Sequence, residues 1–223
     1  MGAKGEAQEW AEIVRRYGER SGLTYEPVGG INPKDGPVAL CVGGGNRLTG
    51  QLVEGFWGSS CDADEREVGG FFGKAVLPGA LLAKAHMPDL AAVVSAFNVE
   101  SIEGHERIAQ RFGRKVEFES IDFNRRFLAT VPREYDPLAL RELFSPGFLA
   151  WTTTMTGEID FGVNDRQLWF LWQLRERSEA ELKEALKNAG QLFERLRGEM
   201  DESGVHTYPP GPWHAGLEPF PRA

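Results

Sequence analysis

The sequence predicts an α+β fold in which a mostly antiparallel sheet carries an amphipathic helix from each end of the chain. Three observations lead to this prediction: a helical apolar period near both ends, short apolar runs cut by glycine and proline between them, and one hairpin pattern with an aromatic strand. We expect a single domain over residues 1–202, because a chain of 223 residues can bury about 70% of its unfolded surface in one core. Residues 203–223 hold five prolines and no apolar period, which predicts a proline-rich tail outside that core.

The first helix is expected over residues 6–21. Its apolar side chains recur at intervals of three and four residues, at Trp10, Ile13, Val14 and Tyr17. This spacing places them on one face of a helix, which Gly22 is expected to end.

Short strands dominate the expected structure between residues 38 and 95, where glycine and proline interrupt the apolar runs and disfavour helix. The expected strands cover residues 38–42, 48–53, 55–60, 68–76, 81–85 and 90–95. The second and third should form a hairpin that turns at Glu54 and Gly55. For the last two segments helix remains the alternative.

Helices and strands alternate in the expected structure of the middle region. Helices are expected at 103–112 and 136–144, and strands at 115–118 and 127–131. Pro137 suits the first position of its helix, where the missing N–H costs nothing. The segment 147–155 is open, because its apolar residues could line a helix while its three threonines lower helix propensity.

The last part of the expected core has the clearest pattern. Residues 158–163 and 167–174 flank an Asn-Asp turn and predict a β-hairpin. A long helix is expected over 178–200, with an apolar face formed by Leu182, Ala185, Leu186, Ala189, Phe193 and Leu196.

Two local patterns support the start of that helix. Ser178 and Glu181 have the spacing of a capping box. Glu179 and Lys183 have the spacing of an i,i+4 ion pair.

Charge and cysteine content restrict the expected partners and compartment. The chain has 25 basic and 33 acidic residues, a net charge of −8, and the absence of a basic stripe disfavours nucleic acid or an anionic membrane as a partner. The apolar-looking stretch 75–97 contains Lys84 and Asp89 and is not expected to insert into a membrane. Cys41 and Cys61 lack CxxC spacing, which predicts free thiols in the cytoplasm, with a single bridge between them as the alternative.

We expect no cofactor and no metal. Gly45 and Gly50 have the spacing of a phosphate-binding loop, but Lys and Ser or Thr do not follow them. The four histidines are His86, His105, His206 and His214. No two of them lie four residues apart, as in the common helical metal site.

The sequence assigns no catalytic residue. A nucleophile within Ser59-Ser60-Cys61-Asp62 would need a base such as His86 or His105, and no local signature supports it. The carboxylate pairs Glu117 with Glu119 and Asp160 with Asp165 are expected as solvated surface groups rather than as an acid and a base.

One candidate partner contact lies in the segment 119–127. Ser120 should cap a short turn that Asn124 ends in the left-handed conformation. Arg125 and Arg126 could then pair with nearby carboxylates or with an acidic group of a partner.

A second candidate contact lies in the tail. Tyr208 and Trp213 flank a proline-dense run that favours polyproline II, a conformation that aromatic grooves bind. The alternatives are an inert solvated tail and a tail whose Trp213 and Phe220 fold back onto the domain.

Short motifs along the chain resemble those of a known family. They are Gly-Leu-Thr-Tyr at 22–25, Asn-x-Leu-Thr-Gly at 46–50, Ser-x-Asp-Phe-Asn-Arg-Arg-Phe at 120–127 and Leu-x-Ser-Pro at 143–146. In this order, and followed by the last hairpin and helix, they resemble a family of uncharacterised, mostly actinobacterial proteins, over residues 10–197. The resemblance implies an α+β domain of unknown function, carried in some members behind membrane helices, and it transfers no activity and no catalytic residue.

Two hypotheses for function follow. The first is a soluble non-enzymatic binding or adaptor domain with a protein partner and an undetermined oligomeric state, in one version an immunity-type inhibitor whose acidic face enters a basic active site. The alternative is a hydrolase-like enzyme of unrecognised type, with its site near the loops from Gly43 to Cys61.

Overall fold

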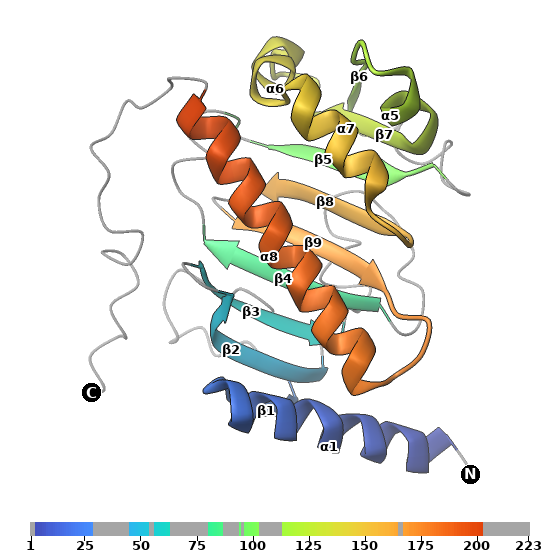
Figure 1. Ribbon diagram of the computed structural model, residues 1–223, viewed down its shortest axis with the longest axis vertical. Coiled ribbons are helices and arrows are strands. Elements are labelled where there is room, and N and C mark those ends of the chain that lie inside the picture. Colours follow the sequence, from blue (N-terminus) through green and yellow to red (C-terminus); the bar gives the residue numbers. More distant parts are fainter. Residues whose placement is uncertain are drawn as a thin grey trace.

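The computed structural model describes residues 3–28, 45–53, 56–62, 80–86, 94, 96–102, 113–164 and 167–202. These residues form the α+β fold that the sequence predicts. A sheet runs through the molecule, and helices α1 (Ala3–Ser21) and α8 (Glu179–Glu202) pack on it (Figure 1). No helix within the described ranges is long and apolar enough to cross a bilayer.

The described strands form one nine-stranded sheet in the order β1-β2-β3-β4-β9-β8-β5-β7-β6. Their bounds are β1 Thr24–Val28, β2 Gly45–Val53, β3 Phe56–Asp62, β4 Ala80–His86, β5 Phe97–Ser101, β6 Arg114–Val116, β7 Phe127–Val131, β8 Ile159–Asn164 and β9 Gln167–Gln173. Every pairing among them is antiparallel. The expected hairpins β2–β3 and β8–β9 are confirmed.

One face of this sheet carries the hydrophobic core. Successive side chains of a strand point to opposite faces, and on β9 the residues Leu168, Phe170 and Trp172 join the core. Helix α8 crosses this face over β2, β4 and β9, and α1 packs on β1 and β2 (Figure 1).

The N-terminal helix confirms the apolar stripe. Trp10 and Val14 are buried, and Ile13 and Tyr17 pack against the core. Gly22 adopts a positive φ of 70°, and the N–H of Leu23 bonds the carbonyl of Gly18 at 2.8 Å. The helix therefore ends on the glycine that the sequence indicates.

Helix α8 confirms the apolar face and half of the capping box. The N–H of Glu181 bonds the Ser178 hydroxyl at 3.2 Å. The Glu181 carboxylate does not return the bond to Ser178, because it accepts from the backbone N–H and the guanidinium of Arg175 instead. Lys183 pairs with Glu179 at 2.7 Å, as expected.

Three short helices lie near the β5–β7–β6 end of the sheet: α5 (Ile121–Arg126), α6 (Pro137–Leu143) and α7 (Pro146–Thr154). Segment 147–155 is thus helical. Ser145 decides this, because its hydroxyl accepts the N–H of Phe148 at 3.1 Å and Pro146 follows at the first helical position. The Phe148 ring then packs against Phe144, with centroids 4.6 Å apart.

Other expectations are corrected or lie outside the described residues. Strand 115–118 is shorter, as β6 shows, and β5 forms where no strand was expected. The expected strands 38–42 and 68–76, most of 90–95, the helix 103–112, the loops at 43–44 and 54–55, and the tail lie outside the described residues.

Candidate functional site

The two arginines expected to contact a partner have different environments. Arg126 donates to the carbonyl of Thr153 at 2.7 Å and to that of Gly157 at 3.1 Å, and its guanidinium lies 5.0 Å from the centre of the Phe127 ring. It therefore ties α5 to the end of α7. Arg125 is exposed. Contact of either with a partner stays a prediction, and Tyr208 and Trp213 lie outside the described residues.

The expected role of Asn124 is wrong. Asn124 is helical within α5, and Asn46 alone of the described non-glycine residues has a positive φ. The Asn124 amide instead brackets the backbone of Phe118, donating to its carbonyl at 2.6 Å and accepting its N–H at 3.2 Å. Both amide atoms have partners nearby, so no left-handed turn is needed.

Asp62, from the segment considered for a nucleophile, lies in a polar network between α1 and the sheet. Trp10 Nε1 donates to Asp62 Oδ1 at 2.7 Å, Asn46 Nδ2 donates to Oδ2 at 2.9 Å, and Tyr25 donates to Asn46 Oδ1 at 2.9 Å. Burial raises the pKa of Asp62, and these donors oppose that rise. One carboxylate oxygen thus holds α1 on β3 and the other joins β3 to β2, so the arrangement is explained by a structural role.

The face of the sheet opposite the core carries buried polar side chains that sequence reasoning missed. Asn98 and Glu100 on β5 and Asp160 on β8 are each at most 5% exposed. Asn98 Nδ2 donates to Glu100, and Asp160 accepts the N–H of Ser101 at 3.0 Å. Asp160 is thus buried rather than solvated, and Asp165 lies outside the described residues.

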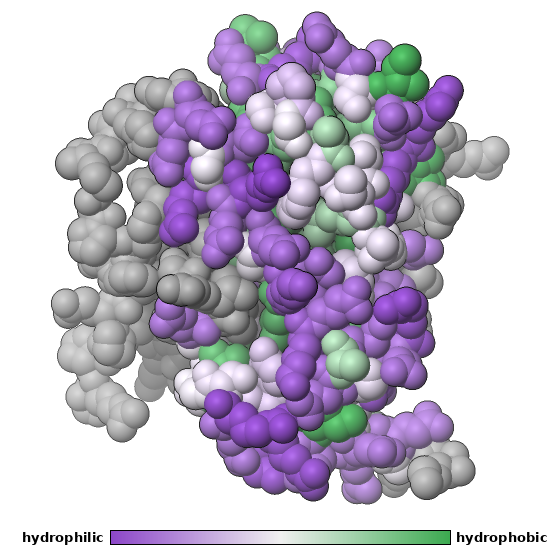
Figure 2. All heavy atoms as spheres, viewed as in Figure 1, coloured by the Kyte–Doolittle hydropathy of each residue, from purple (hydrophilic) through white to green (hydrophobic). Residues whose placement is uncertain are grey.

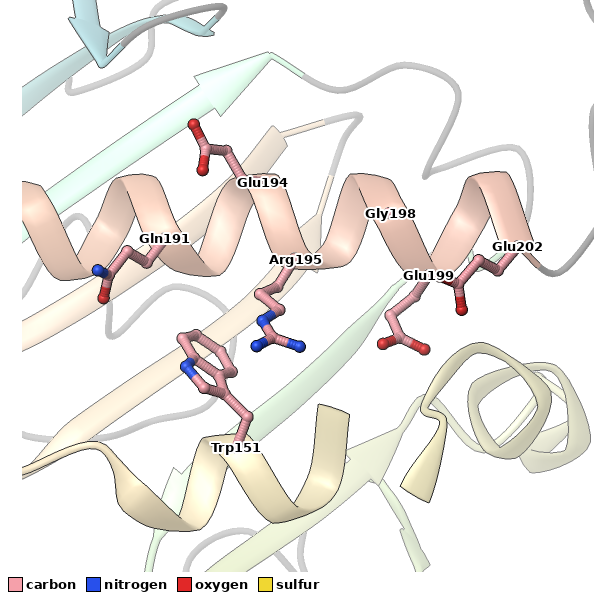
Figure 3. A pocket seen from close by; sticks show the side chains of 7 residues that line it. All are labelled: Trp151, Gln191, Glu194, Arg195, Gly198, Glu199 and Glu202. Carbon is pink, nitrogen blue, oxygen red and sulfur yellow. The ribbon is translucent and has the colours of Figure 1, made fainter. Parts of the chain in front are cut away.

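Among the described residues, a groove between α7 and the C-terminal half of α8 forms a candidate site. It encloses about 340 Å³ and is open to solvent. Its lining is Trp151, Gln191, Glu194, Arg195, Gly198, Glu199 and Glu202 (Figure 3). One hydrogen bond joins the two helices beside it: Ser145, which caps α7, donates its N–H to Glu199 Oε2 on α8 at 3.1 Å.

Trp151 and Arg195 face each other across this groove. The indole rises from α7, and the Arg195 guanidinium lies 5.2 Å from its ring centre (Figure 3). Such a cation–π contact is attractive because the ring face is electron-rich. Trp151 is half-buried and Arg195 is exposed, so a bound group could reach both.

The outer surface of α7 carries no charge. Thirteen consecutive residues, from Ser145 to Gly157, lack a charged side chain. Pro146, Gly147, Ala150 and Thr154 are exposed among them. In Figure 2 this helix is a pale patch bordered by the strongly hydrophilic surface of α8. A solvent-facing helix normally exposes charged residues, so this uncharged surface is unusual.

The chemistry of the groove suits recognition. The part of the chain that the structure describes contains no group of three or more potential metal ligands. The groove offers one aromatic wall, one guanidinium and three carboxylates, and its described lining contains neither a nucleophile nor an imidazole. Such groups bind another molecule through stacking and charge pairing.

Comparison with known proteins gives a fold and no family. The crystal structure of the mycobacterial trehalose monomycolate transport factor A, TtfA, is similar to this chain. The TM-score is 0.53 at 13% sequence identity, and the match covers 84% of this chain and 94% of that one. No protein-family model and no curated protein sequence matches the chain. At 13% identity the likeness shows a shared fold alone.

Proposed function

We propose that this chain is a non-enzymatic binding or adaptor domain that docks a partner protein on the α7 surface and the adjoining groove. The observation that carries the proposal is the uncharged, solvent-exposed face of α7 beside the half-buried Trp151. The centres of protein interfaces are depleted in charge and enriched in tryptophan and arginine. Binding of another protein over a surface with these two properties is favourable, because no charge has to be desolvated there.

Two further points support an adaptor over a catalyst. The described carboxylate with a raised pKa, Asp62, has both oxygens engaged in structural hydrogen bonds, one to Trp10 of α1 and one to Asn46 of β2. The solved structure with the same fold is described as a transport factor, a role compatible with an accessory protein. The proposal places the domain in the cytoplasm, following the low cysteine content, and an immunity-type inhibitor remains one version of it.

The test is to change the α7 surface without disturbing the fold. Ala150 is exposed on α7, so Ala150→Glu adds a charge at the centre of the docking face at little cost to stability. Ala7→Glu is the matched control, because Ala7 is an exposed alanine on α1. Tagged wild-type chain and both variants are expressed in the native host, cross-linked and purified, and the partners are quantified by mass spectrometry.

We expect the wild type and Ala7→Glu to recover the same stoichiometric partner, and Ala150→Glu to lose it at least tenfold. The same partner in equal yield from all three would show that α7 is not the docking surface. The enzyme alternative near Gly43–Cys61 would gain support if the partner were absent throughout.

A further inference from the structure

We propose that the groove and the last turn of α8 bind a basic segment of the partner, through an arginine or lysine side chain that stacks on Trp151 and pairs with Glu199 and Glu202. This inference rests on the proposed function and names the chemistry of the partner. Three features of the described residues support it.

The first feature is the charge of the groove. Three carboxylates, Glu194, Glu199 and Glu202, line it against one guanidinium, that of Arg195. Figure 3 shows Glu199 and Glu202 toward the end of α8, beyond Arg195, whereas Glu194 points away from Trp151. A cation that approaches from the end of α8 would therefore meet Glu202 and Glu199 before it reaches Arg195 and Trp151.

The second feature is that these charges have no ion-pair partner among the residues that the structure describes. None of the three carboxylates, nor Arg195, forms a salt bridge with a described residue. Glu199 is 9% exposed and accepts one hydrogen bond, from the N–H of Ser145. The groove thus retains acceptor capacity for an incoming donor.

The third feature is the position of the carboxylates on the helix. Glu199 and Glu202 lie in the last four residues of α8, and its last turn contains no basic residue. The C-terminus of a helix carries partial negative charge, so carboxylates there repel it and a cation is favoured. A basic side chain would relieve both the repulsion among the carboxylates and that from the helix end.

Trp151 supplies the stacking partner. Its ring packs against the Arg195 guanidinium at 5.2 Å, so the indole is oriented to stack with a planar cation, and an incoming arginine would compete with Arg195 for it. The volume of about 340 Å³ lies at the lower end of the range for ligand sites, which suits a side chain better than a whole folded element. The uncharged α7 surface beside it would contact the rest of the segment.

The test uses blocked peptides of equal length as probes: hexa-arginine, hexaserine and hexaglutamate, titrated calorimetrically at about 0.15 M salt, where charges more than about 8 Å apart are screened. The test variant is Glu199→Gln with Glu202→Gln, because an amide oxygen can still accept the Ser145 N–H. The control is Glu9→Gln with Glu176→Gln, which removes the same charge from exposed positions on α1 and before α8. Trp151→Leu tests the stacking wall independently.

We expect hexa-arginine to bind the wild type, to bind the Glu199/Glu202 variant and Trp151→Leu at least tenfold more weakly, and to bind the control within twofold of wild type. A thermal unfolding scan should show the Glu199/Glu202 variant at least as stable as the wild type, which separates lost binding from lost structure.

Equal weakening in the control would mean that the peptide responds to net charge alone, and the inference would fail. It would also fail if hexaserine or hexaglutamate bound as tightly as hexa-arginine, or if no probe bound. In each of these cases the Ala150→Glu capture experiment still decides the proposed function, because that substitution leaves all groove carboxylates in place.

Discussion

The two halves of α8 differ in how their charged side chains are paired. In the first half, Glu179 pairs with Lys183 and with Arg20 of α1, and Arg175 pairs with the buried Glu181 and with Glu184. In the second half, Glu194, Glu199 and Glu202 have no salt bridge with a described residue, and the last turn lacks a basic side chain. The first half follows the electrostatic rules of helix stability, whereas the last turn of the second half departs from them because it is acidic.

We infer from this difference that the first half of α8 mainly stabilises the fold and that the second half is the one that recognises a partner. Helix α8 packs on the sheet and on α1, and in its first half the cap, the ion pairs and the apolar face all favour the same structure. Natural proteins depart from such consistency mainly at functional sites. The unpaired carboxylates beside Trp151 and α7 are therefore where we expect a partner.

The largest expected effect comes from the apolar face that anchors the helix. Leu186 is 2% exposed, so Leu186→Ala should destabilise the protein by about 2–5 kcal/mol through lost burial and a cavity. Lys187 is exposed on the polar side, and Lys187→Ala should leave the urea midpoint nearly unchanged. Equal midpoints for the two variants would contradict the assigned face.

A smaller loss of stability is expected from Arg175→Ala. Burial alone would raise the pKa of Glu181, but hydrogen bonds from Arg175 outweigh it and hold that pKa below the ordinary 4.5. A lowered folded-state pKa stabilises above the unfolded value and loses this effect as pH falls. In urea, the free energy of unfolding of Arg175→Ala should be lower than that of the wild type at pH 7, and the difference should narrow below about pH 4.5. A difference independent of pH would exclude this ion pair as its cause.

A still smaller effect is expected at the exposed ion pairs of Glu179. Hydrogen bonds from Lys183 and Arg20 lower the pKa of Glu179 to about 2. Glu179→Gln should therefore reduce stability slightly at pH 7, and the reduction should disappear as pH falls from about 4.5 toward 2. High salt should weaken it as well, since exposed charges are screened. Thermal scans across pH and salt measure both trends.

The smallest expected effect is an increase in stability, whereas the three substitutions above decrease it. Removing a carboxylate from the C-terminus of α8 by Glu202→Gln should raise stability by about 0.3–1 kcal/mol at pH 7. Glu9→Gln, near the N-terminus of α1, should give no such gain. A loss of stability in Glu202→Gln would mean that this carboxylate has a structural role in the fold.

The sequence predicted elements with a strong period or an unambiguous turn. Helix α8 and the β8–β9 hairpin are confirmed because their apolar patterns allow one periodicity each. Strand β5 was missed, although Phe97, Asn98, Val99 and Glu100 alternate between apolar and polar. The alternation is short, and it gives no sign that the polar side chains are buried as well. A local sequence pattern does not reveal that distant segments of the chain bury a residue.

The groove was missed for a different reason. Trp151 and Arg195 are far apart in the sequence, and only packing of α7 against α8 brings them within 5.2 Å. Two local signals were nevertheless present: an uncharged run from Ser145 to Gly157 and an acidic last turn in a helix. Each is weak alone, and their significance depends on their being adjacent in the fold.

The most direct test of the recognition end of α8 follows the indole N–H signal of Trp151 by NMR during titration with hexa-arginine, with Trp151→Leu identifying the signal. The account predicts a saturable shift of this signal that exceeds the shifts of Trp10 and Trp172, which are buried, and that is lost in the Glu199/Glu202 variant. A Trp151 signal that stays fixed while the peptide binds would contradict it.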